Sequence, residues 1–251
     1  MTFGLTNALS FRLIVTLLST TCFLSCSSNQ EAAHSTEDYY LNPLTFSGKG
    51  IVYRYSAVND PSLPDEIWHY RFHEGNQGNF LRATMYTPSG EVVQQSIERV
   101  TRVKAQLLSL DLIYRDEHGQ KEIATHISQS STFIFGPIDS VTQTVYKIEY
   151  WDTAEDSVRV SLTKRRTLEG STEYVISGEP IAAIRISTVE KLETETEGFT
   201  ETTWFGTEIF GQDYGLVYYK KTISDEFVLE YGLVEIMTYS TFQARYLDGA
   251  H

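Results

Sequence analysis

Cysteine is nearly absent from this 251-residue chain: Cys22 and Cys26 are the only two, and none follows residue 26. A body without cysteine forms no internal disulfide and offers neither a thiol nucleophile nor cysteine ligands for a metal. With about 200 residues, such a body can bury enough apolar area to fold without covalent links. A metal or redox site at the pair itself would need further Cys or His at ligand spacing, which the neighbouring sequence lacks. The two cysteines are therefore interpreted as part of an N-terminal signal for export and processing.

Basic residues are also scarce, with 20 Lys and Arg against 33 Asp and Glu, a net charge of −13 at pH 7. Residues 1–25 hold one Arg and no acidic residue, so the chain after them carries 19 − 33 = −14. Such a surface repels nucleic acid and does not favour docking on anionic lipid head groups. The one basic cluster, Lys164–Arg166, falls in a strand-like run and is interpreted as a solvated face. We therefore expect no nucleic-acid partner.

The apolar run near the N-terminus is too short to span a membrane. It extends from Leu13 to Leu24, which is 12 residues, and it follows Arg12, the only charged residue before Cys26. A spanning helix needs about 20 residues, whereas the core of a secretory signal takes roughly 7–15. Small and polar residues follow the run. Residues 1–25 are therefore expected to be a signal peptide.

The tetrapeptide FLSC, Phe23–Cys26, resembles the lipobox of bacterial lipoproteins, in which an aliphatic residue and two small residues precede a cysteine. Ser25 matches this pattern, while Leu24 and Phe23 are bulkier than its usual residues. The resemblance implies cleavage before Cys26 and acylation of that cysteine, for example with palmitate, which would anchor the protein to a membrane. It also implies a bacterial cell envelope location, with the outer membrane favoured and its periplasmic or surface face left open. The alternative is an ordinary signal peptide cut nearby.

The remaining chain is expected to form one β domain. Residues 26–42 predict a lipidated N-terminus with a flexible polar tether, and residues 43–247 form the domain. Apolar and polar residues alternate along GIVYRYSAV, EIWHYRFH, VYKIEYW and IRISTVEKLE, as in strands with one buried face. Short turn sequences such as TPSG, LEGST, SGEP and FGQDYG separate the runs. The segment from residue 91 to residue 106 fits a helix or a strand, and the preceding turn favours a strand.

These patterns predict an all-β fold with a long, curved, mostly antiparallel sheet, a half-barrel or open barrel of about ten to twelve strands. The stretch GQDYGLVYYKK and the last strand, EFVLEYGLVEI, resemble envelope proteins built on such a sheet, including the lipoprotein-carrier proteins. Tyr214–Lys221 contributes most of this similarity. The resemblance implies a concave sheet face that holds acyl chains or a protein segment.

The sequence contains no motif of a known catalytic class. It lacks the nucleophile elbow G-x-S-x-G, the phosphate-binding G-x-x-x-x-G-K-[ST] and the dinucleotide-binding G-x-G-x-x-G. His69 and His73 are four residues apart, but on a strand they would lie about 13 Å from each other, too far to share a metal ion. We therefore expect no catalytic residues, no metal site and no cofactor.

Aromatic residues are the most informative remaining feature, with 16 Tyr, 13 Phe and 3 Trp, including the pair Tyr218 and Tyr219. They fit an ordinary sheet core, or an apolar groove inside a curved sheet. The candidate groove residues are Trp68, Tyr70, Phe72, Tyr146, Ile148, Tyr150 and Tyr219. Two functions follow: a non-enzymatic envelope protein that binds a lipid or hydrophobic segment, or a structural or protein-interaction lipoprotein with a filled β core.

Overall fold

The computed structural model describes residues 35–42, 48–75, 78–116, 119–140, 143–151, 158–195 and 198–248. The expected signal peptide and Cys26 lie outside these ranges. All helices and strands in these ranges belong to one compact unit, His34–His251. No helix in the described ranges has the length and apolar composition needed to cross a membrane.

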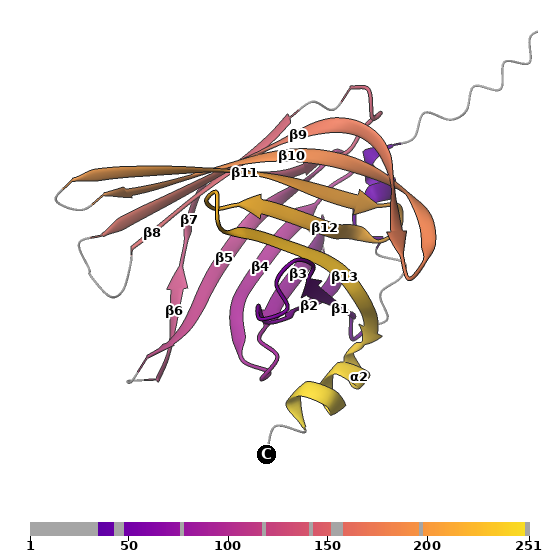
Figure 1. Cartoon of the computed structure of the whole chain (residues 1–251), viewed down its shortest axis with the longest axis horizontal. Coiled ribbons are helices and arrows are strands. Elements are labelled where there is room, and N and C mark those ends of the chain that lie inside the picture. The colour runs from indigo at the N-terminus through magenta and orange to yellow at the C-terminus, as the bar shows by residue number, and fades with distance from the viewer. Residues whose placement is uncertain are drawn as a thin grey trace, which may run out of the picture. The chain divides into compact units, whose positions relative to one another are not determined.

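The described residues form thirteen strands, joined in one antiparallel sheet (Figure 1). They are β1 (Ile51–Ala57), β2 (Glu66–Gly75), β3 (Gly78–Tyr86), β4 (Val92–Val100), β5 (Lys104–Asp116), β6 (Gly119–Ala124), β7 (His126–Ile134), β8 (Gln143–Trp151), β9 (Arg159–Ile176), β10 (Glu179–Glu195), β11 (Phe199–Gly211), β12 (Gly215–Thr222) and β13 (Val228–Thr238). The order in the sheet is β4-β3-β2-β1-β13-β12-β11-β10-β9-β8-β7-β5-β6. Most neighbours in the sequence are neighbours in the sheet, because short turns join antiparallel strands.

The sheet closes on itself through a further pairing of β4 with β5. The other edge of β5 pairs first with β7, at Lys104–Gln106, and then with β6, at Asp111–Asp116. Twelve strands thus complete the ring, and β6 is an extra strand on β5. The prediction of an all-β, curved antiparallel sheet is confirmed, and the expected open barrel is in fact closed. The ambiguous segment from residue 91 is also a strand, β4.

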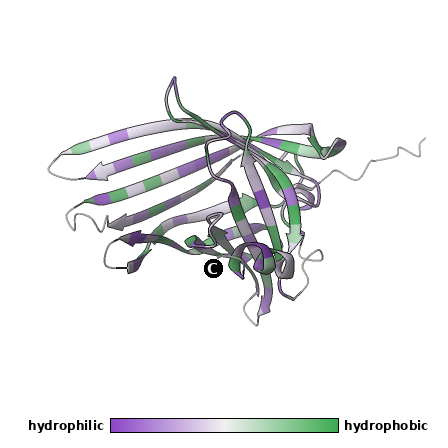
Figure 2. Ribbon diagram, turned by 60° about the horizontal axis from the view of Figure 1, so that its bottom comes forward, coloured by the Kyte–Doolittle hydropathy of each residue, from purple (hydrophilic) through white to green (hydrophobic). Residues whose placement is uncertain are grey.

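Alternating burial explains why these sequences form strands. On β10, Ile184 and Ile186 are buried while Arg185 between them is exposed. The same alternation of hydrophobic and hydrophilic residues is visible along the long strands in Figure 2. The predicted turn LEGST is wrong, because this stretch continues β9. Gly170 has a φ of 126° there, and the β9–β10 register shifts beside it, so the glycine marks a bulge.

The N-terminal segment packs earlier than the sequence predicted. The short 3₁₀ helix η1 (Thr36–Tyr39) is fixed to the end of β7, where the Thr36 N–H donates to the Gly136 carbonyl at 2.9 Å. Tyr39 is almost fully buried in a cluster with Phe133 and Ile184. The expected tether, residues 26–42, is therefore wrong for residues 35–42, because burying this aromatic ring holds the segment against the sheet.

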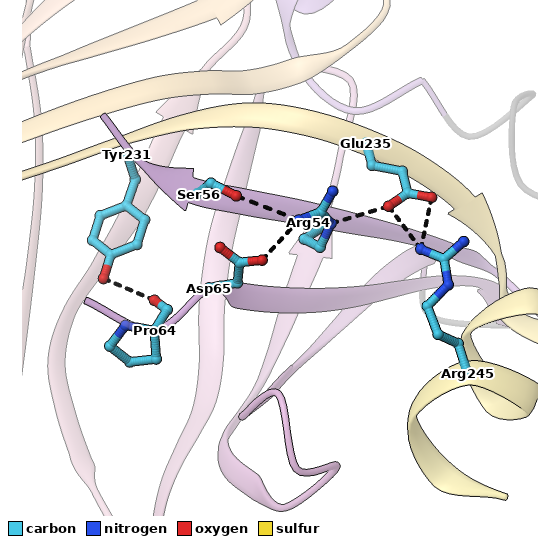
Figure 3. Close-up of polar contacts among 7 residues, drawn as sticks. All are labelled: Arg54, Ser56, Pro64, Asp65, Tyr231, Glu235 and Arg245. Atoms are coloured by element: carbon cyan, nitrogen blue, oxygen red, sulfur yellow. Dashed lines mark hydrogen bonds and ion pairs between the residues drawn. The ribbon is translucent and has the colours of Figure 1, made fainter. Parts of the chain in front are cut away.

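The C-terminal helices α2 (Tyr239–Phe242) and η3 (Gln243–Leu247) pack on β1, β2 and β13. Phe242 is fully buried against Val52, Ile67 and Met237. Ion pairs fix the same contact in Figure 3, where Arg245 bonds to Glu235 at 2.9 Å. Glu235 also forms an ion pair with Arg54 at 3.0 Å, and Arg54 forms another with Asp65 at 2.8 Å. These two helices therefore form a cap on the sheet that is held by apolar burial and by ion pairs.

Replacing the buried ring of this cap should destabilise the whole domain. We expect Phe242→Ala to lower the free energy of unfolding by about 3–5 kcal/mol, because the substitution leaves a cavity where the ring was. Urea denaturation followed by circular dichroism measures this change. Ser240→Ala, at an exposed position of the same helix, is the control and should change the value by about 0.5 kcal/mol or less. Equal stability of Phe242→Ala and the native chain would show that the cap does not support the sheet.

Candidate functional site

A cavity of about 590 Å³ lies within the closed sheet. Its apolar lining comes largely from β3, β5, β8 and β9, because alternate residues of a strand face inward, with one register shift on β5 between Leu107 and Ser109. Those residues are Leu81, Ala83, Met85, Leu107, Leu110, Leu112, Ile148, Tyr150 and Leu162. A volume of roughly 300–1,000 Å³ is typical of small-molecule sites, so this interior is large enough for a ligand.

The structure brings six of the seven candidate groove residues to this cavity. They are Trp68, Tyr70, Tyr146, Ile148, Tyr150 and Tyr219. Phe72 lies on the same strand as Trp68 and Tyr70, but it is not among the residues that line the cavity.

The N-terminal segment contributes to the cavity wall. Tyr40 and Leu41, which follow η1, both line it. The Tyr40 ring packs against Phe133 and Phe135, with centroids 5.4 and 5.3 Å away. Its hydroxyl donates a hydrogen bond to the Glu98 carboxylate, so the segment is held by a polar contact as well.

One side of the cavity is charged. Lys164 and Arg166 lie on β9, Glu190 on β10, Glu208 on β11 and Lys221 on β12. These four strands are consecutive in the sheet and run side by side in Figure 1. The register of β9 against β10 places Lys164 directly opposite Glu190, so their side chains share the inner face of the sheet.

The five side chains form one continuous ion-pair network. Lys164 Nζ lies 2.8 Å from Glu190 Oε1 and 2.7 Å from Glu208 Oε1. Arg166 donates from Nε to Glu208 Oε2 at 2.7 Å, and from Nη2 to Oε1 at 3.2 Å. Lys221 bonds to the second oxygen of Glu190. Such a forked Arg–carboxylate contact is among the stronger polar interactions in proteins.

The network fixes the charge states of its members. Burial alone would raise the pKa of Glu208, but the adjacent Arg166 and Lys164 outweigh burial and lower that pKa to about 2. Burial would likewise lower the pKa of Lys164, yet Glu208 and Glu190 raise it overall. The interpretation of Lys164–Arg166 as a solvated face is therefore wrong for Lys164 and Arg166. Only Arg165, between them, is exposed.

Another carboxylate of the cavity has a different environment. Glu66 accepts hydrogen bonds from the Tyr219 hydroxyl at 2.6 Å and from Trp68 Nε1 at 3.1 Å. No ion pair of Glu66 occurs within the described ranges. Burial raises its pKa, and the two hydrogen bonds offset part of that increase. Sequence reasoning singled out both donors but missed the acceptor that joins them.

The three histidines that the structure describes, His69, His73 and His126, do not line the cavity. His69 is buried, its Nε2 lies 2.8 Å from the Lys49 carbonyl oxygen, and its ring stacks on Tyr239. His73 is exposed, and His34, His118 and His251 lie outside the described residues. Within the described ranges there is no group of three or more His, Cys, Asp or Glu residues that could hold a metal ion.

No protein-family model and no curated protein sequence matches this chain. Its fold is shared with two solved bacterial structures. A candidate lipoprotein from Parabacteroides distasonis matches with a TM-score of 0.50 and 13% identity, over 79% of this chain and 98% of that one. A candidate exported protein with a YmcC-like fold, from Bacteroides fragilis, matches with a TM-score of 0.52 and 10% identity, over the same shares. At this identity the likeness establishes the fold alone.

The network predicts how stability depends on acid. Because the pKa of Glu208 is lowered on folding, its contribution is complete above about pH 5 and is lost as the pH falls towards 2. We expect Glu208→Gln to be less stable than the native chain by on the order of 3 kcal/mol at pH 7, and by much less at pH 2. Urea denaturation across this pH range measures the difference. Glu195→Gln, at an exposed position on β10, is the control, and a pH-independent difference for Glu208→Gln would contradict the prediction.

Proposed function

We propose that this chain is a lipid-anchored bacterial envelope protein that binds a lipid acyl chain or another hydrophobic segment and performs no catalysis. The observation that supports this best is the cavity of about 590 Å³ within the closed sheet, with leucines along several of its strands. Apolar cavities of this size favour ligands that lose contact with water. The polar groups of the cavity mostly bond to one another, which suits a binding site better than a nucleophilic one.

The proposed location rests on the N-terminus and on the shared fold. The run Leu13–Leu24 and the tetrapeptide ending in Cys26 have the features of a lipoprotein signal. One solved protein with this fold is described as a candidate lipoprotein and the other as a candidate exported protein. We propose acylation at Cys26 and attachment to the outer membrane.

A second candidate function is protein interaction. It is favoured by large apolar side chains that are exposed on β8 and β11, namely Trp151 at 58%, Phe199 at 63% and Phe205 at 64%. Surfaces of this kind mark interaction sites when they are contiguous. A filled β core, which this alternative assumed, has less support, because a cavity lies within the sheet.

Binding of an acyl chain to the soluble chain tests the proposal. In the described ranges, every strand and every apolar cluster lies between Ser35 and Asp248, so a protein that starts at Ser27 contains all of these elements. We expect a fluorescent probe with an acyl chain and a neutral head to bind saturably, one per chain, and to be displaced by an unlabelled long-chain alcohol. Emission that rises without saturation, or that the alcohol does not reverse, would contradict the proposal.

A further inference from the structure

The charged side of the cavity specifies which kind of lipid fits. Resting on the proposed function, we infer that the cavity takes an amphiphile with an anionic head group, a carboxylate or a phosphate, bound by Lys164, Arg166 and Lys221. A purely apolar ligand would leave this network facing hydrocarbon, which is costly for buried charges. An amphiphile would cover the leucine wall with its chain and meet the network with its head.

The network contains more positive than negative charge. Three cations share two carboxylates. Glu208 forms ion pairs with Lys164 and Arg166. Glu190 forms ion pairs with Lys164 and Lys221. The side chains of these residues are at most 23% exposed, so bulk water screens them poorly. In these direct ion pairs one cation is in excess, and an anionic head group would pair with it.

The cations also have hydrogen-bond donors to spare. Arg166 uses Nε and Nη2 for Glu208, and Nη1 for the Thr132 carbonyl at 2.9 Å, which leaves two of its five N–H groups. Lys164 uses two of its three N–H groups for carboxylates. Lys221 bonds once, to Glu190, and its Nζ lies 4.0 Å from the centroid of the Trp204 ring. All three remain able to donate to an oxyanion.

The other two carboxylates that line the cavity do not fill this role. Glu98 is bonded to the Tyr40 hydroxyl, and Glu66 to Tyr219 and Trp68. In the described part of the chain, neither makes an ion pair with Lys164, Arg166 or Lys221, although the charge of Glu98 lies close enough to Arg166 to contribute to the raised pKa of that arginine. In the part of the chain that the structure describes, neither carboxylate therefore takes up the remaining donors of the three cations.

A series of ligands with one chain length and different heads separates the contributions. Dodecanoate, dodecyl phosphate, dodecanol and dodecyltrimethylammonium are titrated by calorimetry, each below its micellar concentration, into protein that starts at Ser27. We expect the two anionic compounds to bind about tenfold or more tightly than dodecanol, because a charged hydrogen bond contributes at least that much. The cationic compound should bind most weakly. The ratio between carboxylate and phosphate then identifies the preferred head.

A substitution in the ion-pair network tests whether the network causes the preference for anionic head groups. Lys221→Met keeps most of the length of the side chain and removes the charge, at the most accessible of the three cations. We expect it to remove most of the anionic preference while the affinity for dodecanol stays within about twofold. Lys191→Met is the matched control, because Lys191 bonds to Glu193 and Glu201 and does not line the cavity. Circular dichroism checks that both variants fold.

The outcomes separate this inference from the proposed function. If dodecanol and dodecanoate bind equally well to the native chain, the cavity binds acyl chains but the inference is wrong. If none of the four compounds binds, the proposed function fails and the inference fails with it. If acetate or inorganic phosphate binds as tightly as the dodecyl compounds, the site holds a free anion, and the inference is wrong again.

Discussion

Filling the cavity with Ala83→Trp should abolish binding of the acyl probe. Ala83 lies on β3, is buried and lines the cavity, so an indole at this position would project into the space. A tryptophan side chain covers about 150–250 Å², an area that the ligand could then no longer bury. At about 25 cal/mol per Å², the lower value corresponds to about 4 kcal/mol, or nearly three orders of magnitude in affinity.

The control for this substitution is Ala124→Trp, at an exposed position on β6 that does not line the cavity. It should leave the affinity for the probe within about twofold, because the surface change removes no ligand contact. Thermal unfolding of both variants shows whether the domain is intact. Unchanged affinity in a folded Ala83→Trp protein would place the binding site elsewhere.

Cys26→Ser should move the protein from the membrane fraction to the soluble fraction almost completely. Each buried CH₂ of an acyl chain contributes about 0.8 kcal/mol to membrane attachment, and more than one chain is needed for a firm anchor. Without the lipid, a net charge of −14 after residue 25 provides no attraction to anionic head groups. Fractionation of cells that express the full-length chain, with immunoblotting, measures the distribution.

Cys22→Ser is the matched control, because Cys22 lies four residues before Cys26 in the same N-terminal region. This variant should remain in the membrane fraction. Labelling with a radioactive fatty acid should mark the native chain and Cys22→Ser, but not Cys26→Ser. Persistent membrane association of Cys26→Ser would contradict the lipoprotein proposal.

The fold was predictable because apolar and polar residues alternate along many of its strands. On β8, the sequence VYKIEYW separates Tyr146, Ile148 and Tyr150 from their neighbours, and all three line the cavity. Closure of the sheet was not predictable from such patterns. It depends on the pairing of β4 with β5, and on the pairing of the other edge of β5 with both β6 and β7. The alternation within one strand does not determine which strands pair.

The charged network was missed for a related reason. Lys164 and Arg166 occupy the positions of β9 that continue the inward face of Val160 and Leu162, so alternation alone would have placed them inside. Charged residues are rarely buried unless they are paired, and this favoured the solvated interpretation. The partners are Glu190 and Glu208, 26 and 44 residues after Lys164, and only the register of three strands brings them together. One signal was present in the sequence: Glu190 follows Ile184, Ile186 and Thr188 on the inner face of β10.

The N-terminal boundary shows a similar limit. Residues 35–42 are polar enough to resemble a tether, but Tyr39 and Tyr40 pack against the sheet. Once the folded sheet offers an apolar surface, two aromatic rings are enough to hold this otherwise polar segment in place, because each ring buries a large apolar area. That surface is formed by Phe133 on β7, Phe135 just after β7 and Ile184 on β10, all more than ninety residues away.

Native mass spectrometry of the chain from Ser27, produced in bacteria and purified without detergent, tests the central claim most directly. The cavity of about 590 Å³ predicts a population with one additional mass in the lipid range, which is lost on denaturation and absent from Ala83→Trp. Tandem fragmentation of the released species would show whether its head is anionic, as Lys164, Arg166 and Lys221 predict. The bare chain mass alone, for the native protein as well as the variant, would contradict the account of this domain as a lipid-binding protein.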